Sequence, residues 1–71
     1  MKRFGEKLRT LRIQHKLTIR QLASDLDLKS SGHITDLEKG RIYPSMALFL
    51  KITQFFNVSA DQLINDDLEL D

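Results

Sequence analysis

The sequence predicts an all-α fold, a compact bundle of five short helices in one domain. Its 71 residues are near the lower limit at which a single hydrophobic core holds a chain folded, so we expect one domain and no second one. Apolar residues recur at spacings of three and four, as they do on one face of a helix. Residues that favour helix ends separate these apolar segments, and no strand pattern appears outside the last few residues.

The first expected helix covers about residues 3–15. Phe4, Leu8 and Leu11 recur at positions i, i+4 and i+7, which marks the face that turns towards the core. Lys7 and the other charged residues of this segment are expected to fill the remaining faces. The segment is therefore predicted to be an amphipathic helix.

The second expected helix is shorter. Thr18 is a good N-terminal cap, and Leu22, Ala23 and Leu26 follow at i+4, i+5 and i+8. The apolar pattern lapses at Asp27, so the helix is expected to end there after about eight residues.

The third expected helix lies in the stretch KSSGHITDLEKGR, residues 29–41. Ser30 or Ser31 is expected to cap it, and the sequence leaves the choice open. Ile34 and Leu37 turn inward, and Gly40 suits the left-handed residue that ends many helices.

The fourth expected helix begins after Pro44 and Ser45 and ends at Asn57, because asparagine is the second choice after glycine for the left-handed position. Its apolar residues repeat at spacings of three and four. They are Met46, Phe49, Ile52, Phe55 and Phe56.

A last short helix is expected from the Ser59 cap to Ile64. The acidic tail, residues 65–71, is too short and too polar to be expected to fold. Leu68 and Leu70 leave a small docking strand possible.

The whole chain, 1–71, is expected to be one domain with its folded core at about residues 4–64. The expected core residues are Phe4, Leu8, Leu11, Leu17, Leu22, Leu26, Ile34, Leu37, Phe49, Ile52, Phe56, Val58 and Leu63.

The charges are unevenly distributed, although the net charge is only +1. Residues 1–41 contain ten lysines and arginines against five acids, whereas residues 42–71 contain one lysine against five acids. The basic part is therefore expected to face phosphates while the acidic part faces away. The alternative is an ordinary helical surface of alternating charge.

Several classes of protein are disfavoured by composition. The chain has no cysteine, no signal-peptide core and no apolar run long enough to span a membrane, so we expect a cytoplasmic protein without disulfides. Its two histidines, His15 and His33, lie in different expected helices, and no phosphate-binding loop or paired acids are recognisable. We therefore expect no enzyme, no metal site and no cofactor.

The second and third expected helices, joined by a tight turn, have the lengths that a helix-turn-helix unit needs. Spacing alone leaves other helical hairpins possible. The segment LTIRQLASDLDLKSSGHITDLEKGRIYPS, however, resembles the Cro-like, XRE-type helix-turn-helix family of phage repressors and bacterial regulators, and the resemblance covers about residues 4–64.

The matching elements follow one another in the order and spacing of the family. They are the apolar and basic first helix, Leu17-Thr18, Leu22-Ala23, Ile34, Leu37-Glu38, Gly40, Pro44-Ser45, Val58-Ser59 and Leu63. The resemblance implies a lambda-repressor-like domain of five helices that binds duplex DNA in a sequence-specific way. It also implies a dimer and control of transcription.

Base contacts in this motif come from the N-terminal part of the third helix and its outer face. The candidates for base readout are Lys29, Ser31, Gly32, His33 and Asp36. The candidates for phosphate contacts are Thr18, Arg20, Gln21, Ser30, Lys39 and Arg41. For His33, an exposed histidine without a role is the alternative, and for Lys39 to Arg41 it is an ordinary helix end.

The family resemblance also implies an ion pair between Arg12 and Glu38. On a helical wheel Glu38 lies about 40° from Ile34, so the acid flanks the buried face. A partly buried pair would clamp the third helix to the first, whereas a solvated pair would contribute almost nothing.

The sequence departs from the family pattern at several positions. Ile19 stands where glutamine is common, Lys16 and Asp27 stand where glycine is frequent, and the segment between Ala23 and Ile34 is one residue longer. We therefore expect an enlarged turn.

Some residues suggest contacts with other proteins. Asp25 and Asp27 are either ordinary surface acids or a contact patch for a protein partner. The candidates for a dimer contact, which would otherwise be extra core, are Leu48, Leu50 and Ile64. The leading hypothesis is a small transcriptional regulator, in particular a repressor, that binds a near-palindromic operator as a dimer. The alternative is a protein-interaction module or antitoxin that uses the same fold and its acidic surface.

Overall fold

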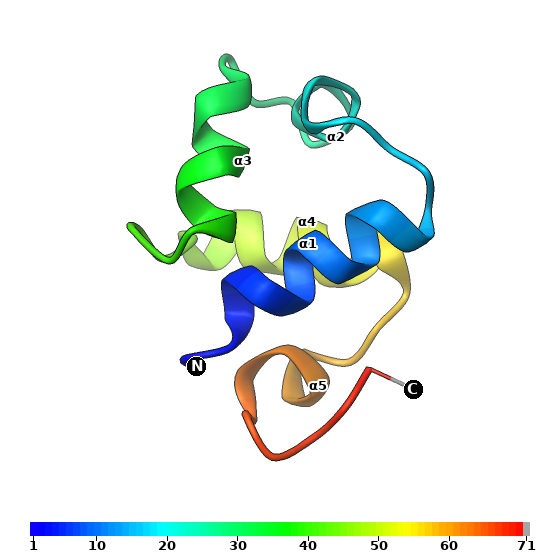
Figure 1. Ribbon diagram of the computed structural model, residues 1–71, viewed down its shortest axis with the longest axis vertical. Helices are drawn as coiled ribbons and strands as arrows, with labels where there is room; N and C mark the ends of the chain where they lie inside the picture. Colours follow the sequence, from blue (N-terminus) through cyan, green and yellow to red (C-terminus); the bar gives the residue numbers. More distant parts are fainter. Residues whose placement is uncertain (71) are drawn as a thin grey trace.

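The computed structural model describes residues 1–70 and confirms the all-α fold. Its helices are α1 (Phe4–Gln14), α2 (Ile19–Asp25), α3 (Ser31–Glu38), α4 (Met46–Phe56) and α5 (Ala60–Ile64). In Figure 1, α2 and α3 form one end of the molecule, α5 and the C-terminal tail form the other, and α1 and α4 lie between them. No strand forms within residues 1–70, so the docking strand considered for Leu68 and Leu70 is absent.

Side-chain caps fix where four of the helices begin. Thr18 and Ser59 form capping boxes with the glutamines three residues later, and the Ser45 hydroxyl accepts from the amide of Leu48. At α3 the Ser30 hydroxyl accepts from the amide of Gly32 at 3.1 Å. Ser30, and not Ser31, is therefore the cap that sets the start of α3.

The left-handed region of the backbone marks where four of the helices end. Lys16, Asp27, Gly40 and Asn57 have φ values of 57°, 59°, 74° and 54°. Lys16 and Asp27 are the two positions at which the related family often has glycine. A side chain in this conformation costs about 1–2 kcal/mol, which explains why glycine is favoured there.

The core matches most of the expected set and differs at its edges. Leu17 and Val58 are only partly buried against it, while Ala23 and Leu48 join it. The aromatic contacts Phe4 to Phe49 and His15 to Phe56, with ring centroids 6.0 and 4.9 Å apart, place α1 alongside α4.

Lys7 was expected on an outer face of the first helix, and that expectation is wrong. The side chain is only 1% exposed. Its ammonium donates to the carbonyl oxygens of Gln62, Asn65 and Leu68, the last two at 2.8 and 2.7 Å. The C-terminal turn of a helix leaves such carbonyls without partners, so Lys7 caps α5 and the tail from within the fold.

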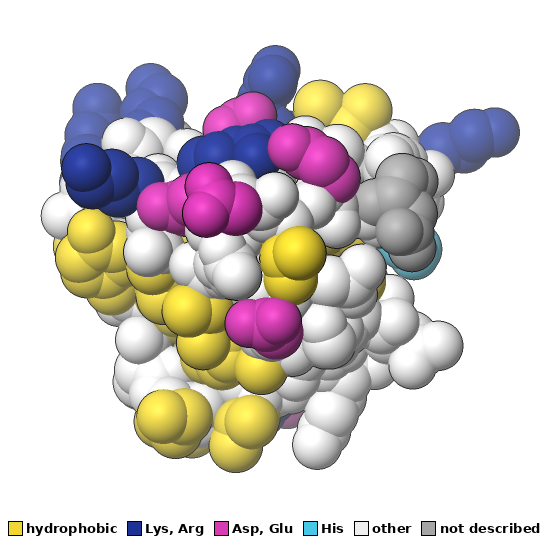
Figure 2. Space-filling view, turned by 90° about the horizontal axis from the view of Figure 1, so that it is seen from below, with side chains coloured by type: hydrophobic (Ala, Val, Ile, Leu, Met, Phe, Trp, Pro, Cys, Tyr) yellow, Lys and Arg dark blue, Asp and Glu magenta, His cyan; other side chains and the backbone are white. Residues whose placement is uncertain are grey.

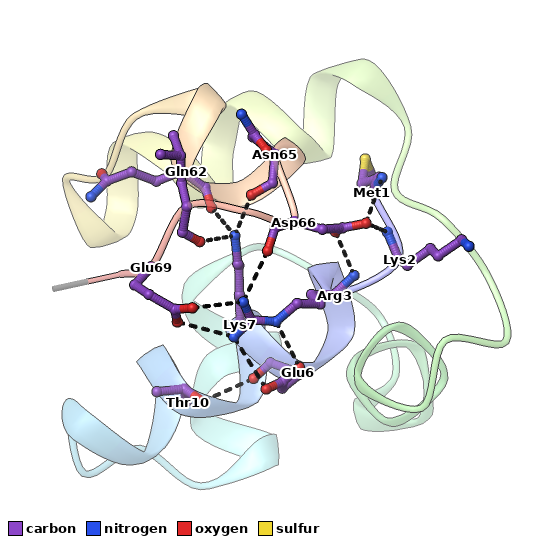
Figure 3. A network of polar contacts seen from close by, with 11 residues as sticks. Met1, Lys2, Arg3, Glu6, Lys7, Thr10, Gln62, Asn65, Asp66 and Glu69 are labelled. Atoms are coloured by element: carbon purple, nitrogen blue, oxygen red, sulfur yellow. Dashed lines mark hydrogen bonds and ion pairs between the residues drawn. The ribbon is translucent and has the colours of Figure 1, made fainter.

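In the acidic tail, for which the sequence alone predicts no fold, residues 66–69 lie against the start of α1 (Figure 3). The carboxylate of Asp66 accepts from the amides of Arg3 and Lys2 at 2.8 and 3.0 Å. These two hydrogen bonds, led by that from Arg3, hold the pKa of Asp66 below its ordinary value. α1 has no side-chain cap of its own. Asp66 supplies the hydrogen-bond acceptor for the backbone amides of Lys2 and Arg3, which precede that helix.

Arg3 completes this contact between the two ends of the chain. Its guanidinium binds both carboxylate oxygens of Glu69, at 3.0 and 3.1 Å, and also pairs with Glu6. The hydrogen bond from Arg3 lowers the pKa of Glu69, and the bonds to Glu69 and Glu6 raise the pKa of Arg3.

Gly5 lies where α1 crosses the end of α3. A β-carbon at Gly5 would lie 2.5 Å from the carbonyl oxygens of both Leu37 and Glu38. Only glycine permits so close an approach of the two backbones.

Among the described residues, no helix is both long and apolar enough to cross a lipid bilayer.

Candidate nucleic-acid interface

α2 and α3 form a helix-turn-helix unit at one end of the molecule (Figure 1). The apolar side chains between the two helices are fully or almost fully buried. They are Leu22 in α2, Leu26 at its C-terminal cap, and Ile34 and Leu37 in α3. The two helices pack against each other, and α3 also packs against α1. Their polar faces therefore remain available at the surface.

The enlarged turn between these helices is ordered by a hydrogen-bonded helix end. The amide of Leu28 donates to the carbonyl of Ala23 at 2.8 Å, and the amide of Asp27 donates to that of Ser24 at 3.1 Å. This is the Schellman arrangement, with Asp27 in the left-handed position. Leu28 then packs against the core, so the extra residue is absorbed without loosening the turn.

Four of the expected contact residues come together beside this turn. Arg20 from α2 and Lys29, Ser30 and Ser31 from the start of α3 line one shallow polar hollow. Two cations thus lie close to the N-terminal end of α3, where the first backbone amides of a helix have no intrahelical partner.

The other candidates for base readout lie along α3. Gly32 is exposed, while His33 and Asp36 are half-buried. The buried face of the helix is that of Ile34 and Leu37. The surface of α3 that these residues form is therefore short and mixed in character, with one histidine and one acid.

Three of the candidates for phosphate contacts take part in helix caps. Thr18 and Gln21 bond to each other in the capping box, where the Gln21 side-chain oxygen accepts from the amide of Thr18 at 2.8 Å. The Ser30 hydroxyl is occupied as the cap of α3. Gln21 retains its NH₂ group as a donor.

Ile19 replaces the glutamine that is common at this position of the related family, and the structure gives a physical reason. The side chain is half-buried and packs against the core. It therefore stabilises α2 from beneath rather than offering a polar contact.

Arg12 and Glu38 lie against each other between α1 and α3. Arg12 Nε donates to Glu38 Oε2 at 2.7 Å, and Arg12 Nη2 donates to Glu38 Oε1 at 3.3 Å. Arg12 Nη1 also donates to the carbonyl oxygen of Leu17 at 2.9 Å. The two side chains are only 12% and 6% exposed, so the pair is partly buried and fixes α3 to α1.

Lys39 and Arg41 lie at the C-terminal end of α3, and both are exposed. Arg41 Nη1 is 3.1 Å from Asp36 Oδ1. Arg41, an expected phosphate contact, thus forms an ion pair with Asp36, an expected base reader.

The three candidates for a dimer contact separate into core and surface. Leu48 is only 7% exposed and belongs to the core, which is the alternative that the sequence leaves open for it. Leu50 and Ile64 are 48% and 45% exposed.

Ile64 lines an apolar hollow on the surface. The other residues of this hollow are Met1, Pro44, Met46 and Phe49. Figure 2, which views the molecule from the end that holds α5, shows hydrophobic side chains gathered over part of that face, next to a group of acidic and basic ones.

Asp25 and Asp27, the acids near the turn, both line a hollow with Lys51 and Phe55. Asp27 holds the left-handed position at the end of α2 and lies 3.9 Å from Lys51, and Asp25 is exposed. Within residues 1–70, no group of three or more acidic, histidine or cysteine side chains is placed to hold a metal ion.

Sequence reasoning missed Gly5 and Lys7 because their roles depend on contacts with distant segments. For Gly5, the available signal was a glycine inside an apolar helical pattern, which often has a packing reason. For Lys7, the signal was its position three residues after Phe4 and one before Leu8, on the buried side of the wheel.

Comparison with known proteins agrees with this geometry. A family model described as a helix-turn-helix domain matches residues 5–69. A helix-turn-helix transcriptional activator of Enterococcus faecalis, BcrR, is 38% identical over 64 residues, which cover 90% of this chain. The match spans 31% of the length of BcrR. No solved structure matches the chain. The match over nearly the whole chain, together with the α2 and α3 unit, shows that the chain belongs to the helix-turn-helix domain family, of the XRE type that its motifs resemble.

Proposed function

We propose that this domain binds duplex DNA in a sequence-specific manner through α3 and thereby regulates transcription. The observation that carries the proposal is the fixed presentation of α3. Its buried face is held by Gly5 and by the pair of Arg12 with Glu38, while its other face stays polar and partly exposed. A rigidly held helix can enter a major groove at one reproducible angle.

The surroundings of α3 favour a polyanion. Arg20 and Lys29 flank its N-terminal end, and Lys39 and Arg41 flank its C-terminal end. Of these cations, we assign Arg20, Lys39 and Arg41 to phosphates on the two sides of a groove. Base readout then falls to Lys29, Ser31, Gly32 and His33, together with Asp36.

The proposal extends to a dimer on a near-palindromic operator. A twofold protein matches a DNA site with half-sites about one helical turn apart. The exposed apolar residues Leu50 and Ile64 support such a contact, because burial of apolar surface is what stabilises most protein interfaces.

The direction of regulation is the finest part of the proposal. A small domain that covers an operator acts as a repressor when the operator overlaps the promoter, and this is the hypothesis drawn from the sequence. BcrR is named as an activator, and it has far more chain than the matched part. A promoter fusion in cells that contain or lack this protein separates the two directions.

A protein-interaction module is the second candidate function. It is favoured by the apolar side chains at the start of α4, since Tyr43 and Met46 are 69% and 72% exposed. In this role the domain would bind a protein partner and leave α3 unused. A partner that co-purifies with the domain, with no enrichment of any DNA sequence, would support this second function.

Selection of bound sites from a pool of random duplexes tests the main proposal. We expect a near-palindromic sequence to be enriched. Replacement of both Lys39 and Arg41 by alanine should weaken binding to that sequence, whereas Lys2→Ala, which removes an exposed cation at the other end of the molecule, should not. An unenriched pool, or equal binding by the double variant, would refute DNA recognition by α3.

A further inference from the structure

Four helices of this protein end with the same backbone geometry. In each, a left-handed residue is followed by one whose amide donates to the carbonyl five residues earlier, which defines the Schellman motif. These bonds run from Leu17 to Arg12 (3.0 Å), Leu28 to Ala23 (2.8 Å), Arg41 to Asp36 (2.9 Å) and Val58 to Thr53 (3.1 Å).

The end of α3 differs from the other three in the residue after the left-handed position. Leu17, Leu28 and Val58 are apolar and pack against the core, as is usual in this motif. At the end of α3 that residue is Arg41, which is exposed. The apolar contact that seals the other three helix ends is therefore absent here.

An ion pair takes the place of that contact. The backbone of Arg41 is bound to the carbonyl oxygen of Asp36, and its guanidinium is 3.1 Å from the carboxylate of the same residue. The left-handed Gly40 turns the chain so that Arg41 comes back over the surface of α3. Arg41 is thus held at two points by one acid.

The ion pair of Arg41 with Asp36 is exposed to solvent and therefore easily broken. The side chains of Arg41 and Asp36 are 60% and 42% exposed, and exposed pairs of this kind are weak. A DNA phosphate offers a guanidinium the same two-oxygen geometry as a carboxylate. Asp36 and a phosphate therefore compete for the same side chain.

We propose that Asp36 is a specificity-determining residue that acts through Arg41 by withholding the guanidinium from phosphates of non-operator DNA. The pair stays closed when α3 rests loosely on a duplex. It opens where full insertion of α3 in the groove brings a phosphate up to Arg41. This inference rests on the proposed function and changes the role of Asp36 from reading a base to positioning Arg41.

A mutant cycle tests this role. Asp36→Asn, Arg41→Gln and the double variant are titrated with the selected duplex and with a scrambled one. We expect Asp36→Asn to tighten binding to the scrambled duplex by about 1.4- to 5-fold, the value of an exposed ion pair. The slope of log affinity against log salt should steepen by about 0.9, since one more phosphate is contacted. Neither change should appear when Arg41 is already glutamine.

Asp25→Asn is the matched control, because it removes the same charge from an exposed acid of α2 that makes no ion pair within residues 1–70. Its effect should be equal in the presence and absence of Arg41. The proposal is overturned if Asp36→Asn behaves in the same uncoupled way. It is also overturned if Asp36→Asn abolishes preference at one base pair, which would make Asp36 a direct reader.

Binding by the unaltered protein separates DNA recognition by the domain from the role of Asp36. If the unaltered protein binds neither duplex, DNA recognition itself is refuted, and the role of Asp36 with it. If the unaltered protein binds the selected duplex and the cycle shows no coupling between Asp36 and Arg41, only the role of Asp36 is refuted.

Discussion

Arg12 and Glu38 connect the first helix to the last turn of the third through two hydrogen bonds, of 2.7 and 3.3 Å, in a place where both side chains are almost hidden from solvent. Arg12 is bound at the same time to the carbonyl oxygen of Leu17. One guanidinium thus joins α1, the segment that enters α2, and α3. We therefore expect the orientation of the helix-turn-helix unit to depend on this contact.

Removal of one partner of this pair should destabilise the domain strongly. Glu38→Ala leaves the partly buried charge of Arg12 without its acid, and loss of one partner of a buried pair costs about 3–5 kcal/mol. Urea unfolding followed by circular dichroism measures the free energy of unfolding. The double variant Arg12→Met with Glu38→Leu should be more stable than Glu38→Ala, because it leaves no unpaired charge.

If Glu38→Ala lowers the free energy of unfolding by less than about 0.5 kcal/mol, the pair contributes no more than a solvated surface pair. A double variant less stable than the single one would also contradict the account.

Gly5→Ala should destabilise the crossing of α1 and α3. The added methyl would lie 2.5 Å from two carbonyl oxygens, so the helices must separate, and overpacking of this kind costs about 1–3 kcal/mol. Gly32→Ala is the matched control, because the nearest atom to its β-carbon is the Ser30 hydroxyl at 3.3 Å. Equal unfolding free energies for the two variants would show that the close approach does not matter.

Lys7→Met should destabilise the contact between α1 and the tail. Methionine fills similar space but leaves the carbonyl oxygens of Gln62, Asn65 and Leu68 without their donor. A buried polar group left without a partner costs about 1–3 kcal/mol. Lys2→Met changes an exposed lysine and should be nearly neutral in the same urea unfolding experiment. Two neutral substitutions would contradict the role of Lys7.

Asp66 should make the stability of the domain depend on pH in the acid range. Its pKa is held below the ordinary value of 3.8 by the amides of Arg3 and Lys2. A group whose folded pKa is lowered contributes stability above its unfolded pKa, and this stability is lost as pH falls through the folded pKa. Asp66→Asn should therefore lower the melting temperature at pH 7, with a difference that shrinks as the pH is lowered past 3.8.

Asp67→Asn is the control for this experiment. It removes the neighbouring charge, and the Asp67 carboxylate accepts no amide hydrogen bond within the part of the chain that the structure describes. Asp66 would act only through net charge if Asp66→Asn lowered the melting temperature equally at pH 7 and below pH 3.8. The same would follow if Asp67→Asn lowered the melting temperature as much as Asp66→Asn.

The helices were predictable because their signals are local. The apolar spacing of Phe4, Leu8 and Leu11 needs only one segment to be read, and the same is true of the caps Thr18 and Ser59. The choice between Ser30 and Ser31 could not be made in this way, because both are good caps at adjacent positions. The structure settles it through the hydroxyl of Ser30 and the amide of Gly32.

The roles of the chain ends could not be read from a local pattern. The sequence 65–71 is polar enough to favour disorder when considered alone. Residues 66–69 are held because Asp66 and Glu69 accept hydrogen bonds from Arg3 and the carbonyl of Leu68 accepts one from Lys7. These contacts join residues more than sixty positions apart. The ion pair of Asp36 with Arg41 was likewise not anticipated, since each residue was considered separately as a DNA contact.

The salt dependence of binding is the most direct test of the central claim that the basic surface around α3 binds duplex DNA. Each phosphate neutralised by a cation contributes a slope of about −0.9 to log affinity against log salt. With phosphate contacts from Arg20, Lys39 and Arg41 of each subunit, the affinity of a dimer for the selected duplex should fall roughly a thousandfold as salt rises from about 50 to about 200 mM, measured by fluorescence anisotropy. An affinity that stays constant over this range would contradict the account.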